Sequence, residues 1–326
     1  MKKSTYRAST DVALIKYWGK RDEKLRLPEN NSISMILDGL ETVTTVEFRN
    51  DLAQDRVRIA GEARAVEAQR VTRQLDRIRE IAGVAWYAQV ESVNSFPKGT
   101  GLSSSGSGFA ALTCAAADAL DLNLTERELS ILARQASGTA CRCVCGGFVE
   151  WHAGDSSGTS YAETIFPADH WAIHDVVAVV DEGMKRVSST EGHQTAQSSP
   201  FYTTRQAHIG DKIATMKRAI AARDFTSFGE LVEAEALEFH TILLTSQPPL
   251  IAWYPGTVEV MLAVQQMRQD NIEAYFTINT GFNVHVLTLP HYVAAVAERL
   301  QKLSLVQKTL QASIGGKPQK TDAHLF

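Results

Sequence analysis

The chain has 326 residues, of which 44% are hydrophobic and 21% are charged, and its formal net charge is −4. This composition is typical of a globular protein with a sizeable core, and the weakly acidic balance excludes a general attraction to nucleic acid or to anionic membranes. No apolar run reaches the roughly 20 residues of a membrane-spanning helix, and none follows the basic N-terminus, so we expect no signal peptide and a cytosolic location.

In chain order, the first half is predicted to mix strands and helices. Residues 42–48 are rich in β-branched side chains, which predicts a strand. Helical spacing over residues 70–82 places three apolar side chains on one face: Leu75, Ile78 and Ile81. The sequence from Thr125 to Glu128 has the form of a capping box, which predicts that a helix begins there.

The second half is predicted to be largely helical, with short strands. Residues 175–180 form an apolar run of strand length, and helical spacing begins near residue 203. The Pro248-Pro249 pair ends that helical stretch. A further helix is expected over about residues 256–270, followed by a strand at 275–278.

Four cysteines could suggest a metal site, because three of them form a C-x-C-x-C run at residues 141–145. Structural zinc sites usually space their thiols two to four residues apart and add a second pair elsewhere, which this sequence lacks. We therefore interpret the cysteines as buried small side chains in a reducing compartment.

The most informative segment is a glycine-serine loop at residues 97–108, followed by a run of small residues. Glycine lets the backbone approach an anion closely, and serine hydroxyls can bind phosphate oxygens or Mg²⁺. The small residues suit a helix whose N-terminus faces the phosphates. The alternative is a flexible linker, which the apolar Phe96 and Leu102 disfavour. The loop is not a Walker motif, but it predicts a phosphate site.

The order of several motifs resembles one protein family. Residues 97–105, P-x-x-x-G-L-x-S-S, resemble the phosphate loop of the superfamily of galactokinase, homoserine kinase and mevalonate kinase (GHMP kinases). Three further segments are similar to mevalonate diphosphate decarboxylase and its relatives: ALIKYWGKR at 13–21, SGTACR at 137–142 and VSSTEG at 187–192. The matches extend from about residue 8 to residue 283.

The resemblance implies an α+β fold of two domains with the active site in the cleft between them. Residues 1–185 would form a ribosomal S5 domain 2-like N-terminal domain, and residues 186–326 a ferredoxin-like C-terminal domain. The implied reaction uses ATP and Mg²⁺ to phosphorylate the 3-hydroxyl of a phosphorylated mevalonate, after which phosphate and CO₂ leave together. The resemblance implies a small-molecule substrate and is compatible with a homodimer.

The resemblance also assigns roles to individual residues. Lys16 and Arg142 would supply positive charge for the substrate carboxylate, and both lie in apolar surroundings where an unpaired charge would be costly. Ser104 and Ser105 would serve the ATP phosphates and Mg²⁺, Ser105 also as a catalytic residue. The other implied nucleotide contacts are Pro97, Gly99, Gly101, Leu102, Ser103 and Gly106. The other implied substrate contacts are Tyr17, Lys20, Ser137, Gly138, Thr139 and His193.

Arg70 matches a further phosphate ligand, although a solvated helix arginine explains it equally well. At Thr139 the family usually has serine, so the hydroxyl is kept with an added methyl group.

One departure from the family concerns the proposed base. Asn279 lies where the family has an aspartate that is thought to orient or deprotonate the 3-hydroxyl, and an amide cannot act as a base. Three explanations remain: an engineered substitution, a natural enzyme that works with Asn279, or a 3-kinase that stops before decarboxylation. The retained Lys16 and Arg142 argue against the 3-kinase.

A second departure concerns the substrate. Diphosphate-specific members usually have smaller, less basic residues at positions 98–100, and often methionine where this chain has His193. The basic residues favour mevalonate 5-phosphate, since an added donor near the single phosphate can compensate for the missing one. The 5-diphosphate remains the alternative, and neutral drift would also explain the changes.

Two other classes of function compete with a decarboxylase. A sugar or homoserine kinase would share the loop at 97–108 but not the segments around Lys16 and Arg142. A ligand-sensing regulator on a degenerate kinase fold would be consistent with Asn279.

Overall fold

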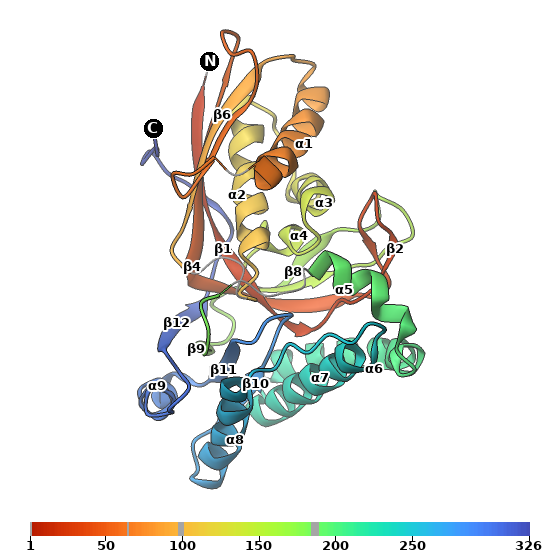
Figure 1. Cartoon of the computed structure of the whole chain (residues 1–326), viewed down its shortest axis with the longest axis vertical. Coiled ribbons are helices and arrows are strands. Elements are labelled where there is room, and N and C mark those ends of the chain that lie inside the picture. The colour runs from red at the N-terminus through yellow and green to blue at the C-terminus, as the bar shows by residue number, and fades with distance from the viewer. Residues whose placement is uncertain (1, 64, 97–100, 184–188) are drawn as a thin grey trace.

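The computed structural model describes residues 2–63, 65–96, 101–183 and 189–326 (Figure 1). Within them, one mixed sheet of 11 strands runs through both halves of the chain. Its main path follows the order β10-β11-β9-β12-β4-β1-β13. The long strands β1 (Lys3–Ile15) and β4 (Ser32–Arg49) pair antiparallel along most of their length and form its centre.

Strand β4 joins two groups of neighbours because it is 18 residues long. Its second half pairs with β6 (Tyr87–Asn94), which in turn pairs with β5 (Arg56–Ile59). Its first half pairs with β7 (Phe148–Trp151), which pairs with β8 (Ala162–Phe166). Near its middle it also meets β12 (Lys308–Ile314).

The C-terminal group of strands is β9 (His174–Val179), β10 (Ala274–Thr277) and β11 (Val284–Thr288), with β12 alongside β9. Strand β13 (Gln319–Lys320) pairs with β1, and β2 (Lys20–Asp22) and β3 (Leu27–Pro28) form a separate hairpin. Strand β9 is buried on both faces, which explains why its sequence reads as a continuous apolar run.

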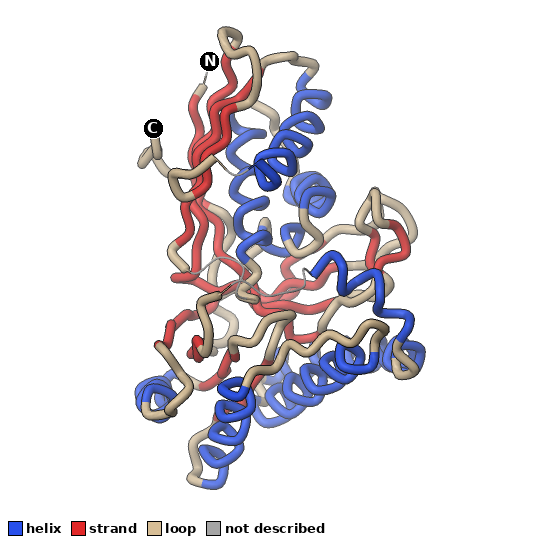
Figure 2. The backbone as a smooth tube through the Cα atoms, in the orientation of Figure 1, coloured by secondary structure: helices blue, strands red, loops and turns tan. Residues whose placement is uncertain are grey.

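Helices cover this sheet in two groups, as Figures 1 and 2 show. The helices α1 (Ala65–Ala82), α2 (Ser104–Ala119), α3 (Glu126–Ala136) and α4 (Ala140–Cys143) lie beside the N-terminal strands. The long helices α6 (Tyr202–Ala222) and α7 (Phe225–Thr245) pack side by side against the other end of the sheet, preceded by the short α5 (Ser189–Thr195). The helices α8 (Pro255–Gln269) and α9 (Val293–Gln301) pack against the C-terminal strands.

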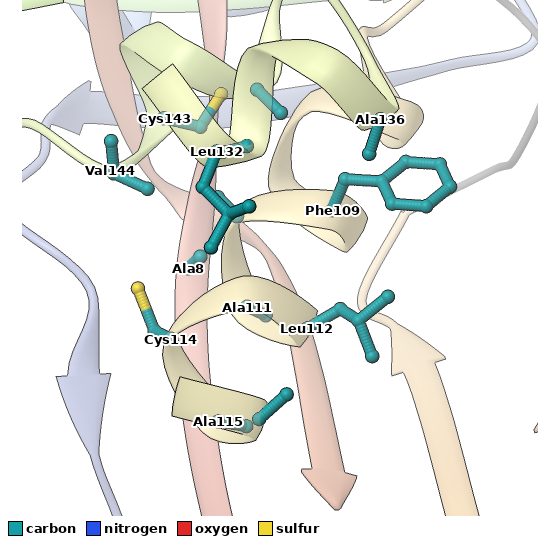
Figure 3. Close-up of a cluster of buried hydrophobic side chains, with 14 of the residues drawn as sticks. Ala8, Phe109, Ala111, Leu112, Cys114, Ala115, Leu132, Ala136, Cys143 and Val144 are labelled. Carbon is teal, nitrogen blue, oxygen red and sulfur yellow. The ribbon is translucent and has the colours of Figure 1, made fainter. Parts of the chain in front are cut away.

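The N-terminal core is rich in small side chains along α2, which let neighbouring helices approach closely. Figure 3 shows part of it, where Leu132 of α3 points toward α2 near Ala111. All four cysteines are buried and carry free thiols. Within the described residues, no three histidine, cysteine or acidic side chains gather as a metal site.

The structure confirms most of the predicted helices and strands. The strand predicted at 42–48 is part of β4, and the Thr125 capping box begins α3. Of the three apolar side chains placed on one face of α1, Leu75 and Ile78 are fully buried, whereas Ile81 is 52% exposed. The helical period continues there past the point where α1 meets the core. Among the described helices, none has the length and apolar character needed to cross a bilayer.

Candidate active site

Two glycines bring the phosphate loop against a loop from the C-terminal half. Gly101 has a φ of +93°, a conformation that favours glycine. A Cβ on Gly101 would lie 2.6 Å from the Cα of Gly281 and 2.9 Å from its backbone nitrogen. The two loops therefore touch backbone to backbone, and Asn279 Nδ2 lies 3.5 Å from the Gly101 carbonyl oxygen. This contact places Asn279 beside the start of α2.

A cluster of hydroxyl groups surrounds the first turn of α2. Ser105 Oγ lies 3.2 Å from Ser137 Oγ, which lies 3.4 Å from Thr139 Oγ1. Ser103, just before the helix, has a φ of 53°. The structure thus brings together three residues predicted for two different ligands, Ser105 for nucleotide and Ser137 and Thr139 for substrate.

The rest of the predicted loop closes this cluster from behind. Leu102 is buried, and its carbonyl oxygen accepts a hydrogen bond of 2.9 Å from Thr10 Oγ1. A Cβ on Gly106 would lie 3.0 Å from Cys143 Sγ and 3.1 Å from Thr139 Oγ1, so glycine lets α2 approach α4. Pro97, Gly99 and Lys98 lie outside the described residues.

Lys16 lies at the end of β1 and is 2% exposed. Its Nζ donates to the Ala13 carbonyl oxygen and to Thr277 Oγ1, both at 2.6 Å, and to Asn279 Oδ1 at 3.3 Å. Burial lowers the pKa of Lys16 to about 7. The negative charge of Glu235 opposes this shift, and the positive charge of Arg142 adds to it. A residue with this pKa exists in both charged and neutral forms near neutral pH.

A buried ionic group supports the backbone of Lys16. Glu235 of α7 accepts the Lys16 backbone N–H at 3.0 Å and forms ion pairs with Arg205 and Lys212 of α6. Burial alone would raise the pKa of Glu235, but the two cations outweigh it and hold the pKa below its usual value. The carboxylate is thus fully occupied in positioning the end of β1, a role that sequence analysis missed.

Arg142 is also 2% exposed, and its main partner is Asp11, which the sequence analysis did not identify. Arg142 Nε donates to Asp11 Oδ2 at 2.7 Å, and Nη1 donates to Ser32 Oγ at 2.8 Å. Asp11 and Arg142 are far apart in the sequence, and the packing of α4 against β1 brings them together. Lys16 and Arg142 lie close enough that each charge disfavours the other.

An aromatic stack holds His193 over the start of the ALIKYWGKR segment. The His193 ring lies 4.3 Å from the Tyr17 ring and 4.2 Å from the Trp18 ring, centroid to centroid. The Gly19 N–H donates to His193 Nδ1 at 3.1 Å. A Cβ on Gly138 would lie 2.7 Å from the Tyr17 hydroxyl oxygen, so Tyr17 and Gly138 are in close contact.

A group of cations lies next to this stack. One of them, Arg26, was missed by the sequence analysis and has a φ of 52°. Its Nε donates to the Gln135 carbonyl oxygen at 3.1 Å. Its positive charge acts to lower the pKa values of Tyr17, Lys20 and Arg70. Burial lowers the pKa of Lys20, whose Nζ donates to Glu23 Oε2 at 2.8 Å.

Arg70 lies on α1 between this group and a pocket. Its guanidinium carbon is 4.8 Å from the centre of the Phe109 ring, and Nη2 donates to the Ala136 carbonyl oxygen at 3.3 Å. It is therefore not a fully solvated side chain. Arg70 also lines a pocket between α1, α2 and the strands β4–β6, whose other walls include Val57, Val90, Ser92, Asn94 and Ser104.

Known protein families match both halves of the chain. A family model described as the diphosphomevalonate decarboxylase-like N-terminal domain matches residues 8–162, and one described as the mevalonate 5-diphosphate decarboxylase C-terminal domain matches residues 175–324. The chain belongs to the diphosphomevalonate decarboxylase family. It is thus an ATP-dependent carboxy-lyase, and the predicted fold class is confirmed.

Individual members of this decarboxylase family resemble the whole chain. A protein of Haloferax volcanii named phosphomevalonate decarboxylase is 35% identical over 91% of this chain and 91% of its own length. The human diphosphomevalonate decarboxylase is 34% identical over 89% of this chain and 78% of its own. The solved mevalonate diphosphate decarboxylase of Staphylococcus aureus has a TM-score of 0.93 and 35% identity, with 98% of each chain covered.

A further solved relative bears on the ligands. The protein described as MDDEF in complex with MVAPP, AMPPCP and magnesium has a TM-score of 0.92 and 36% identity, with 98% of each chain covered. This supports the use of ATP and Mg²⁺ by the family. In the present structure, the hydroxyls of Ser104 and Ser105 at the start of α2 suit a nucleotide-bound Mg²⁺, which keeps most of its oxygen ligands from phosphates and water.

Proposed function

We propose that this decarboxylase acts on mevalonate 5-phosphate and releases isopentenyl phosphate, CO₂ and phosphate, using ATP. The family match supports the reaction class, and the substrate rests on the basic residues around His193. The 5-diphosphate is the alternative substrate, since most of the named relatives are diphosphomevalonate decarboxylases. A 3-kinase or a ligand-sensing regulator is disfavoured, because the chain keeps buried Lys16 and Arg142 at the proposed carboxylate site.

The nucleotide would occupy the pocket beside α2. The apolar walls of this pocket suit a nucleobase, and Ser92 and Asn94 offer hydrogen-bonding groups. The phosphates would lie toward Ser104 and Ser105 at the N-terminus of α2, where backbone N–H groups and the helix dipole favour anions. Bound Mg²⁺ would neutralise phosphate charge there, with Ser104 and Ser105 as its protein ligands.

The substrate carboxylate would lie between Arg142 and Lys16. Arg142 is oriented by Asp11 and Ser32, so its guanidinium is held in place before substrate arrives. Ser137 and Thr139 lie beside Ser105, and they would hold the substrate next to the phosphate that is transferred. Decarboxylation then follows from loss of the new 3-phosphate, which leaves a cationic centre that the carboxylate electrons fill.

His193 is the observation that favours the monophosphate. Its Nδ1 accepts the Gly19 N–H, so in the neutral ring the proton is on Nε2 and this nitrogen is a donor. The stacking of its ring between Tyr17 and Trp18 fixes the direction of that donor. Arg26, Lys20 and Arg70 would add positive charge around the same phosphate.

A comparison of the two esters tests this proposal. The kcat/KM for ATP-dependent release of phosphate and CO₂ is measured with mevalonate 5-phosphate and with the 5-diphosphate. We expect a preference of at least tenfold for the 5-phosphate, and His193→Met should reduce its kcat/KM by about 10- to 100-fold if a charge-assisted hydrogen bond is lost. A tenfold preference for the diphosphate would refute the substrate assignment. ADP without CO₂ would indicate a 3-kinase, and neither product would indicate a regulator.

A further inference from the structure

The proposed reaction begins with loss of the 3-hydroxyl proton, and Asn279 cannot accept it. The amide oxygen of Asn279 accepts a hydrogen bond from Lys16 Nζ at 3.3 Å, and the amide nitrogen faces the Gly101 carbonyl. Neither atom is basic at neutral pH. A base, if one acts here, must be another side chain beside Asn279.

Two neighbours are already committed to other contacts. His240 Nε2 lies 3.0 Å from the Asn279 backbone oxygen, which can only accept, so Nε2 carries the proton in that hydrogen bond. Burial lowers the pKa of His240 to about 3, and Lys16 adds to the shift, so the ring is neutral and a donor. The Glu235 carboxylate is held by two cations and by the Lys16 backbone.

We propose that the neutral amine of Lys16 is the general base that removes the 3-hydroxyl proton in this enzyme. This inference rests on the proposed function and adds a second role to a residue already placed at the carboxylate. Lys16 is buried, and its Nζ lies 2.6 Å from the Ala13 carbonyl oxygen, 2.6 Å from Thr277 Oγ1 and 3.3 Å from Asn279 Oδ1. A neutral amine has only two N–H groups, which would donate to the two nearer oxygens, so its lone pair would point to the side of Asn279. Asn279 contributes by lacking a charge, because an aspartate at that distance would hold Lys16 in its ammonium form.

The other charges around Lys16 leave the neutral form accessible. The titratable and charged groups that face it from the neighbouring elements are Asp11 on β1, Arg142 on α4, Arg205 on α6, and Glu235 and His240 on α7. Both carboxylates among them are paired with arginine, Asp11 with Arg142 and Glu235 with Arg205. Burial therefore outweighs them, and the pKa of Lys16 falls to about 7, near the optimum for a base at neutral pH.

The proton balance of the cycle can be written through this one residue. The lone pair of Nζ takes the 3-hydroxyl proton as the oxygen attacks the γ-phosphorus of ATP, and the bond from that phosphorus to ADP breaks. The C3–O bond then breaks and phosphate leaves, after which the bond to the carboxylate carbon breaks and its electrons form the double bond as CO₂ is released. The ammonium of Lys16 returns its proton to the departing phosphate, so the amine is restored.

The direction of the pH dependence distinguishes this role from that of a cation. If Lys16 is the base, activity rises with pH through an apparent pKa near 7. If Lys16 must be charged, activity falls above that pKa. The substrate phosphate also titrates in this range and makes the same contribution to the pH–activity profile of every variant. The decisive quantity is therefore the difference between the profiles of the variants.

The experiment measures kcat and kcat/KM for CO₂ release between pH 5.5 and 9 in the unaltered enzyme and in three variants. Lys16→Arg keeps the charge but cannot lose its proton, so we expect at least a 100-fold loss of kcat with little change in substrate affinity. Asn279→Asp supplies a carboxylate base, so the rise in activity near pH 7 should shrink to the part that comes from titration of the substrate phosphate. Lys217→Arg, a half-exposed lysine on α6, should leave the profile unchanged.

Each outcome decides the inference. A kcat for Lys16→Arg within tenfold of the unaltered enzyme, a loss of activity above pH 7, or superposable profiles for Asn279→Asp and the unaltered enzyme would overturn it. If Lys16→Arg fails to fold, the Asn279→Asp profile alone gives the answer. If no mevalonate ester yields CO₂ at all, the proposed function itself fails.

Discussion

The buried ion pair between Arg142 and Asp11 gives a prediction that separates stability from catalysis. Arg142→Leu removes the cation and leaves the fully buried Asp11 carboxylate without the partner that lies 2.7 Å away in the native protein. Ser32 loses its contact with Nη1 in the same variant. The change should therefore destabilise the fold as well as remove the proposed carboxylate contact.

The size of the effect follows from the burial of both groups. Removing one partner of a buried pair typically costs about 3–5 kcal/mol, because a charge stays buried and uncompensated. In a protein of 326 residues this corresponds to a fall in Tm of roughly 4–7 °C. Adding Asp11→Asn removes that charge, so the double variant should be more stable than Arg142→Leu alone, although an unpaired amide still costs about 1–3 kcal/mol.

Urea denaturation and a CO₂-release assay on the two single variants and the double variant measure both quantities. We expect partial recovery of stability in the double variant but no recovery of activity, since the guanidinium is absent from both. If Arg142→Leu is destabilised by less than about 1 kcal/mol, or if Asp11→Asn restores nothing, the argument from an uncompensated buried charge is wrong.

Three further changes test other parts of the site. Gly101→Ala should lower kcat by about 100-fold or more with a smaller loss of Tm, measured by kinetics and thermal unfolding, because its Cβ would meet the Gly281 backbone at 2.6 Å and separate the two loops. Ser105→Ala should weaken nucleotide binding in the presence of Mg²⁺ by about tenfold in calorimetry, and an unchanged affinity would exclude the hydroxyl as a ligand. Because burial lowers the pKa of Lys16 to about 7, the folded protein releases this proton at lower pH than the unfolded chain, and stability is lost as pH falls toward 7. Between pH 7.5 and 9 the free energy of unfolding should therefore rise by about 2 kcal/mol more in the native protein than in Lys16→Met.

Local signals in the sequence were sufficient for the parts of the fold that depend on neighbours in the chain. The Thr125 capping box and the apolar strand β9 are examples, because each is determined by a few adjacent residues. The predicted strand at 42–48 covers less than half of β4, since the first part of that strand is buried on both faces and lacks the alternation of a half-buried strand.

The site was predictable only where a motif carried it. The glycine-serine loop and the family resemblance indicated Lys16, Arg142 and Ser105, but no local pattern indicated their partners. Asp11 and Glu235 become relevant only after folding brings them to Arg142 and Lys16. Arg26 could have been found only through its unusual backbone conformation, which a lone arginine between two leucines does not reveal.

The position of β12 and β13 in the sheet has a consequence for co-translational folding. These strands follow the other strands of the sheet in the sequence, yet they pair with β4 and β1, which precede most of them. The parts of β4 and β1 that pair with them stay unpaired until residues 308–320 have been translated, and pairing between segments so distant in the sequence is slow. We therefore expect nascent chains to need chaperone protection, and a chain cut before residue 308 to aggregate.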